Sequence, residues 1–537
     1  MPVPLAFNDN VGETIPADTP HKWVMDKMKC GYPRFFIHKS IDRLATEILK
    51  RYGSPSQKAM LFPTHKVANR LLEFMHRIAP ESQGTARIID FVPNPKIESH
   101  DESQHVLPRL SAVLYPADLW PVAKQVWQHS GDGVSSRRAE FVEKHLLDGT
   151  MVDKASIYDK PRKGPRRYQR QMSIDTPHQS PTSEKDDKDS SDPFAFVEER
   201  FGRNLNVQFA EQAKLAIRRR IAGSLTSDAD LKEALKHPED VERTRSAEGF
   251  SVDDVFLYPT GMSSIFNTHR TMMAIRPKNK SISYGFPYVD TLKILEKWGP
   301  GALFYGNGSQ EDLDDLEKRL ESGERFLGFF CEFPSNPLLK CPDLQRIRQL
   351  ADKYDFAVVI DETIGNFLNV HVLPYADVVV SSLTKVFSGD SNVMGGSAIL
   401  NPADYEDNFF EEDAMFLERN SRDFVSRIAR INVNAETICD VLMQHPRIKQ
   451  VNYPKHSPSR KYYDACRLPK GGYGGLLSAT FYSMDDAMLD WAATFGVEAN
   501  LVRFSVGLEE TEALKKVFKT ALDAIPQTET NGNGNAA

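Results

Sequence analysis

Short apolar runs alternate with stretches of helical character between residues 250 and 400, and this alternation limits the fold more than any other feature of the chain. Runs of four to eight apolar residues are typical of strands that are buried on both faces. Such runs separated by helices predict an α/β fold, with a mostly parallel sheet covered by helices. The runs are VFLYPTG, ALFYG, FLGFFCEF, AVVIDE, DVVVSS and SAIL.

Polar residues and one glycine follow four of these runs directly. Because ligands of parallel sheets bind beyond the carboxyl ends of the strands, we expect these residues to meet at one edge. They are Gly261 after LYPT, Glu332 after FFC, Asp361 after AVVI, and Ser382, Thr384 and Lys385 after DVVVS.

An amine beside hydroxyl groups, with a carboxylate on the neighbouring strand, meets the requirements of a pyridoxal-phosphate site. A lysine carries the cofactor, hydroxyls bind its phosphate, and an acid pairs with the pyridinium nitrogen so that the ring stays an electron sink. The 24 residues from Asp361 to Lys385 are enough to connect two such strands.

The same residues belong to motifs that together resemble the Cys/Met-metabolism pyridoxal-phosphate enzymes of fold type I. The resemblance extends from about residue 194 to 525. Within this family, the long N-terminal extension with GYPRFFIH, together with RFGRNL, is similar to the fungal cystathionine gamma-synthases. The shared motifs are YPTGMSS, EFPSNPLL, VVIDET, SSLTK and GGLLSATF.

The resemblance implies a role for each residue of the cofactor site. Lys385 is implied to be the Schiff-base lysine and, like Tyr284 and Asp361, a catalytic residue. The helix that begins at MSSIFNTHR would direct its positive end at the phosphate. The other cofactor-binding residues implied are Gly261 and Met262 (backbone amides), Ser382 and Thr384 (phosphate), Tyr284 (stacking on the ring), Asn336 (ring hydroxyl) and Thr363 (beneath the ring).

Two further residues are implied to contact the substrate. Arg503, in LVRFSVGLE, matches the arginine that binds the substrate α-carboxylate with two hydrogen bonds. Alternation along this strand sets Arg503 on the face opposite Val502 and Phe504, so a structural ion pair is an alternative. Glu332 is the second candidate, and its alternative role is to order the edge of the site.

Two departures from the family are evident. The family takes a Tyr-x-Arg pair from the neighbouring subunit to bind the phosphate, whereas FVEERFGRNLN offers only Arg200, or else Arg203, without that tyrosine. Only about 20 residues connect Ser483 to Arg503, where the family has a longer segment with an S-L-G motif. A stretch of the smaller domain is therefore expected to be missing near residues 484–500.

Composition suggests how the 537 residues are divided. Two polar segments rich in Pro, Ser or Gly cannot bury a core and separate the globular parts. The expected parts are an N-terminal α/β extension of unknown role (1–160), a disordered linker (161–193), a large cofactor-binding domain (194–400), a smaller C-terminal α+β domain (401–525) and a disordered tail (526–537).

Charge and cysteine usage exclude other classes of protein. A net charge of -7 does not favour a nucleic-acid partner. We expect no membrane anchor, because no apolar run reaches the roughly 20 residues that span a bilayer. The five scattered cysteines suggest neither a zinc site nor a disulfide framework, so we expect no metal and a cytoplasmic location.

The function that this resemblance favours is the γ-replacement of an O-acyl-L-homoserine by L-cysteine to give cystathionine. A γ- or β-lyase or a homoserine-ester sulfhydrylase of the same family would share these motifs. A catalytically weak binding or regulatory homologue is the alternative outside enzymes. The resemblance also implies a homodimer or homotetramer.

Overall fold

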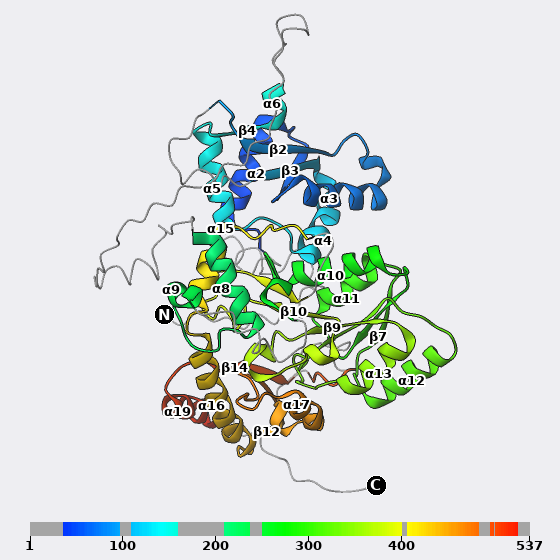
Figure 1. Ribbon diagram of the computed structural model, residues 1–537, viewed down its shortest axis with the longest axis vertical. Coiled ribbons are helices and arrows are strands. Elements are labelled where there is room, and N and C mark those ends of the chain that lie inside the picture. The colour runs from blue at the N-terminus through cyan, green and yellow to red at the C-terminus, as the bar shows by residue number, and fades with distance from the viewer. Residues whose placement is uncertain are drawn as a thin grey trace, which may run out of the picture.

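The computed structural model describes seven stretches of the chain: residues 36–96, 109–158, 209–236, 250–399, 405–482, 494–498 and 500–524. The expected linker (161–193) and tail (526–537) lie outside these residues. In Figure 1 the N-terminal part, in blue and cyan, lies at one end of the molecule, and the C-terminal part, in orange and red, lies at the other.

The N-terminal part is an antiparallel sheet with the strand order β1-β3-β2-β4 and helices on both faces. Helices α2 and α5 pack on one face around Leu44, Phe91 and Val142, and α3 and α4 pack on the other around Phe62 and Leu71. The elements are α2 (Lys39–Tyr52), β1 (Gln57–Phe62), α3 (His65–Ile78), β2 (Arg87–Pro93), β3 (Leu110–Pro116), α4 (Trp120–Ser130), α5 (Ser136–Leu147), β4 (Met151–Asp153) and α6 (Lys154–Tyr158).

The central sheet has seven strands in the order β5-β11-β10-β9-β8-β6-β7. Its strands are β5 (Val255–Tyr258), β6 (Ser281–Tyr284), β7 (Ala302–Tyr305), β8 (Gly328–Glu332), β9 (Ala357–Asp361), β10 (Val378–Ser382) and β11 (Gly396–Ile399). The sheet is mostly parallel, as predicted, but β11 runs antiparallel to both of its neighbours. No helix lies between β10 and β11, so the chain reverses there without the crossover that a parallel pair requires.

Two apolar clusters show which side chains face which side of the central sheet. Phe330, Val359 and Val380 pack with α10 and α11 on one face, which we call the α10 face. Phe329 and Ile360 belong to the larger cluster on the other face. The helices of this part are α8 (Ala210–Ala222), α9 (Leu231–Lys236), α10 (Gly261–Ile275), α11 (Val289–Lys297), α12 (Gln310–Glu321), α13 (Leu344–Tyr354) and α14 (Asn366–Asn369).

The C-terminal part has an antiparallel sheet of order β12-β13-β14. Along β14, Val502 and Phe504 pack on the core, whereas Arg503 is exposed, which confirms the predicted alternation. The elements are α15 (Glu411–Asn420), α16 (Phe424–Met443), β12 (Ile448–Asn452), α17 (Arg460–Cys466), β13 (Leu476–Phe481), β14 (Leu501–Ser505) and α19 (Thr511–Asp523).

The N-terminal part packs directly on the central part. Figure 1 shows α4 beside α10, and the ring of Phe74 stacks on Trp298, just after α11, at 4.8 Å between centroids. The two parts therefore share an apolar boundary. Within the described stretches, the helices are too short or too polar to cross a bilayer.

Candidate active site

Glu332 and Asp361 form the centre of the candidate site. Glu332 ends β8, Asp361 ends β9, and the two residues lie opposite each other in the parallel register. Because side chains alternate along a strand, both carboxyl groups continue the rows of Phe330 and Val359 on the α10 face. The sheet thus brings two acids together at its carboxyl edge.

Burial and mutual repulsion make these acids hard to ionise. Burial raises the pKa of Glu332 to about 8, and the nearby charge of Asp361 adds to this, while N–H donors from Tyr288 and Asn336 oppose it. Those amides lie 2.6 and 3.2 Å from the Glu332 oxygens. Burial also raises the pKa of Asp361.

Lys385 supplies the positive charge nearest to Asp361. It lies in the turn after β10, the strand next to β9, and its side chain is exposed. Its charge lowers the pKa of Asp361, against the effect of burial, together with hydrogen bonding from Thr363. The expected juxtaposition of the Asp361 carboxylate and the Lys385 amine is therefore present.

The first turn of α10 touches Ser382 at the same edge. A Cβ added to Gly261 would lie 2.6 Å from the Ser382 Cβ, so this close approach requires glycine. Thr260 caps the helix by accepting the Ser263 N–H at 3.0 Å. The amides of Gly261 and Met262 precede that capped turn, where a helix favours an anion.

Two threonines fix the backbone around this edge. The Thr363 hydroxyl oxygen accepts the Ser382 N–H at 2.8 Å, and the Thr363 N–H donates to Asp361 at 2.9 Å. Thr363 therefore ties β9 to β10 beneath Asp361. The Thr384 hydroxyl instead donates to the Gly395 carbonyl and accepts the Gly395 N–H, at 3.3 and 3.2 Å, so it holds the turn that carries Lys385.

Arg503 approaches the site from the C-terminal sheet. Its guanidinium donates to the Asn336 side-chain oxygen at 3.2 Å, and the Asn336 N–H donates to Glu332. Arg503, Asn336 and Glu332 thus form a continuous series that ends beside Asp361. An exposed arginine next to an amide can bind a carboxylate that enters from solvent.

Tyr284, the residue expected to stack on the cofactor ring, ends β6. Tyr284 follows Ile282 in the cluster on the face opposite the α10 face, its ring lies 5.1 Å from that of Phe329, and its hydroxyl donates to Ser309 at 2.7 Å. Tyr284 also lines a pocket together with Glu332, so its ring-stacking role stays a prediction.

Tyr288 is a residue that the sequence reasoning missed. It immediately precedes α11, which packs on the α10 face, and its backbone N–H is bonded to Glu332. Its backbone is thus fixed to one of the two acids.

The assembled residues suit a ligand with an anionic end and a cationic ring. The first turn of α10 and Ser382 are placed for the anion, Asp361 for the cation, and Lys385 for a bond to a carbonyl carbon. Arg200 and Arg203 lie outside the described residues, so the partner-subunit contact expected of them is not visible.

Two family profiles match the chain. The profile described as Cys/Met metabolism PLP-dependent enzyme matches residues 247–492, which include Lys385 and Asp361. The profile described as Fungal trans-sulfuration enzyme, N-terminal domain, matches residues 40–135. The second match coincides with most of the N-terminal sheet and its helices.

Three relatives are similar over nearly the whole chain. Cystathionine gamma-synthase of Neurospora crassa is 44% identical over 95% of this chain and 98% of its own length. Cystathionine gamma-synthase-like enzyme iboG2 of Amanita muscaria is 37% identical over 96% and 93%. Cystathionine gamma-synthase of Saccharomyces cerevisiae is 32% identical over 96% and 98%. The alignment with the Neurospora relative has 606 positions against 537 residues here, so that relative carries extra residues.

Proposed function

Because the chain belongs to the Cys/Met metabolism PLP-dependent enzyme family, we propose that it joins the sulfur of L-cysteine to Cγ of an O-acyl-L-homoserine, giving L-cystathionine. The enzyme is a pyridoxal-phosphate-dependent transferase. The observation that carries the proposal is the meeting of Asp361, Lys385 and the first turn of α10 at one edge of the sheet.

The residues present fit the cofactor in kind and position. The amides of Gly261 and Met262, with Ser382, would bind the phosphate, and Thr384 keeps the turn that carries Lys385 in place. Asp361 would pair with the pyridine nitrogen and favour its charged form. When bound, the cofactor supplies an electron sink that accepts the negative charge created at Cα and Cβ of the substrate.

The chain itself provides the proton transfers and the orientation of the substrate. Arg503 binds the α-carboxylate, and Asn336 holds Arg503 in place. Lys385, once its amine is free, takes one proton from Cα and one from Cβ and returns protons at the end. The acyloxy group leaves Cγ as a carboxylate, and the cysteine sulfur, which gives up its thiol proton, forms the new bond at that carbon.

Tyr288 is proposed as a second candidate for the ring-stacking role, beside Tyr284. This is supported by its position just before α11 and by its backbone N–H, which is bonded to Glu332. Glu332 accepts the backbone N–H groups of Tyr288 and Asn336, so it orders both sides of the cleft that receives the substrate.

The enzyme is a homo-oligomer in this proposal, with Arg200 contributing to the phosphate site of a neighbouring subunit. It is placed in the cytoplasm because the cysteines of the described residues, all buried, are free thiols, as a reducing compartment maintains them.

The proposed function is tested by giving the purified protein O-acetyl- or O-succinyl-L-homoserine with cysteine and detecting cystathionine by mass. Parallel reactions with sulfide in place of cysteine, or with cystathionine alone, separate a sulfhydrylase or a lyase from a synthase. Cystathionine formed from one or both esters, and faster than the other products, is the expected result. Turnover in the lyase or sulfhydrylase reaction alone contradicts the proposed reaction but not the family.

A further inference from the structure

The N-terminal part reaches the first turn of α10 through the loop Gly131–Asp132. Gly131 ends α4 with a left-handed backbone (φ 62°), and its carbonyl accepts the Thr260 hydroxyl proton at 3.1 Å. A Cβ at residue 131 would collide with the Thr260 hydroxyl and lie 2.8 Å from the Met262 Cβ. Only glycine therefore lets this loop touch the cap of α10.

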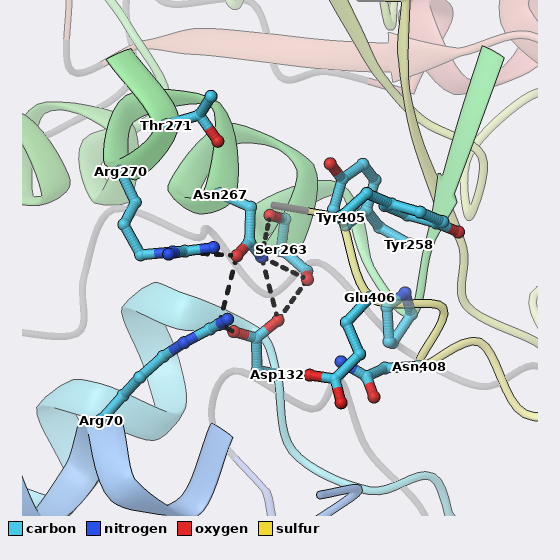
Figure 2. Close-up of a pocket in the computed structure, with 11 residues that line it drawn as sticks. Arg70, Asp132, Tyr258, Ser263, Asn267, Arg270, Thr271, Tyr405, Glu406 and Asn408 are labelled. Atoms are coloured by element: carbon cyan, nitrogen blue, oxygen red, sulfur yellow. Dashed lines mark hydrogen bonds and ion pairs between the residues drawn. The ribbon is translucent and has the colours of Figure 1, made fainter. Parts of the chain in front are cut away.

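The next residue, Asp132, is bound to α10 by its side chain. Its carboxylate is 2% exposed and accepts hydrogen bonds from the Ser263 hydroxyl and from the Asn267 amide at 3.3 Å. Arg70, on α3, donates to the same carboxylate at 2.7 Å and to the Asn267 side-chain oxygen at 3.1 Å. Figure 2 shows these groups converging on Asp132 from both parts of the chain.

The contact is specific because a buried carboxylate is costly unless it is fully bonded. Burial raises the pKa of Asp132, and the charge of Arg70 and the hydrogen bonds from Ser263 and Asn267 oppose that shift. Removing any of these partners would leave the buried carboxylate of Asp132 without full compensation for its lost hydration. The first turn of α10 is thus held in one position from outside the central domain.

We propose that the Gly131–Asp132 loop positions the first turn of α10 to bind the cofactor phosphate. This inference rests on the proposed function. The amides of Gly261 and Met262 lie within two residues of Thr260 and Ser263, the two residues whose hydroxyl groups donate hydrogen bonds to the loop. Asp132 does not contact the cofactor itself, so it is a positioning residue. Through this residue the N-terminal part contributes to cofactor binding.

Two cofactors that differ only in the phosphate isolate this role. Dissociation constants of pyridoxal phosphate and of pyridoxal are measured by fluorescence titration of the cofactor-free full chain, for the parent and for Asp132→Asn. The matched control is Asp413→Asn, which weakens another buried ion pair made by the N-terminal part, Arg137–Asp413 at 3.0 Å, away from α10 and with α15 as the partner element.

We expect the preference of the parent for pyridoxal phosphate over pyridoxal to fall about 10-fold in Asp132→Asn, as for one weakened hydrogen bond to a charged group, and to stay unchanged in Asp413→Asn. Ser263→Ala, which removes only the hydroxyl partner, should lower it too and serves if Asp132→Asn does not fold. An unchanged preference in the folded variants overturns the inference, whereas a parent that binds neither cofactor overturns the proposed function.

Discussion

Tyr284 and Tyr288 are four positions apart and cannot be distinguished by composition. Tyr284 packs in the apolar cluster opposite the α10 face, whereas Tyr288 immediately precedes α11 and bonds Glu332 through its backbone N–H. Both faces of this sheet are buried, so the strand sequence has no polar face from which to infer direction. The sequence therefore predicts the segment, and the choice between Tyr284 and Tyr288 is left to experiment.

The assignment of Tyr288 is tested by Tyr288→Ala, with Tyr284→Phe as the control. Losing an aromatic contact of about 0.5–1.5 kcal/mol should weaken pyridoxal-phosphate binding roughly 2- to 10-fold. Tyr284→Phe removes only the hydroxyl bond to Ser309 and should leave cofactor affinity unchanged while lowering the melting temperature. Cofactor titration of both variants is the measurement. A larger loss of affinity in Tyr284→Phe than in Tyr288→Ala would assign the stacking role to Tyr284.

The acid pair predicts a pH-dependent stability of the cofactor-free protein. The pKa of Glu332 is raised from 4.5 to about 8 in the folded chain, so the folded state retains a proton that the unfolded state has lost. Stability contributed by this group is therefore present below about pH 4.5 and is lost as pH rises toward about 8. Glu332→Gln abolishes that loss.

Melting temperatures at several pH values between about 5 and 8 test this expectation. The difference between Glu332→Gln and the parent should shift in favour of the variant as pH rises. Glu321→Gln, on an exposed residue of α12, should give a constant difference. Parallel pH profiles for Glu332→Gln and the parent would show that Glu332 does not hold the extra proton.

At the scale of single elements, the apolar runs predicted six of the seven strands of the central sheet and missed β6 (Ser281–Tyr284). The strand ends placed Glu332, Asp361 and Ser382 at one edge. The direction of β11 was not apparent, because a run of four residues has the same composition in either direction. The absence of a helical stretch between β10 and β11 was the available signal.

The segment expected to be short, residues 484–500, connects β13 and β14 of the C-terminal sheet. Strands β13 and β14 pair from Thr480 opposite Leu501 to Leu476 opposite Ser505, and in the described residues the other edge of β14 has no partner strand. An unpaired edge beside Arg503 reduces support for the carboxylate site.

We therefore expect a chain with about 25–35 family-like residues inserted between Ser483 and Leu501 to melt at a higher temperature and to bind the homoserine ester more tightly. One regained hydrogen bond to a carboxylate is worth about 1.5–3 kcal/mol, or roughly 10- to 150-fold in affinity. A Gly/Ser insertion of equal length is the control. Equal melting temperature and KM in all three chains would show that the segment is dispensable.

At the scale of the whole molecule, the sequence separated the N-terminal extension from the catalytic part but gave it no role. The contact that suggests one joins Asp132 to Ser263, 131 positions apart, through residue types that are ordinary in loops and helix starts. Pairings over such distances depend on how the two parts dock, which local patterns do not encode.

Association of subunits is tested by mixing two inactive variants. If Arg200 serves the site of a partner, a hybrid of Lys385→Ala and Arg200→Ala subunits contains one intact site. An equal mixture of exchanging dimers should then recover about a quarter of the parent activity. No recovery, with exchange verified by mass, would place Arg200 in its own subunit's site or outside any site.

The proposed active site depends above all on Lys385 as the residue that carries the cofactor. The most direct measurement is borohydride reduction of the protein with pyridoxal phosphate, followed by peptide mapping by mass spectrometry. A single phosphopyridoxyl group on Lys385, absent from a folded Lys385→Ala variant, is the result we predict. Stoichiometric labelling of another lysine, or none at all with cofactor in excess, would contradict the assignment of this site.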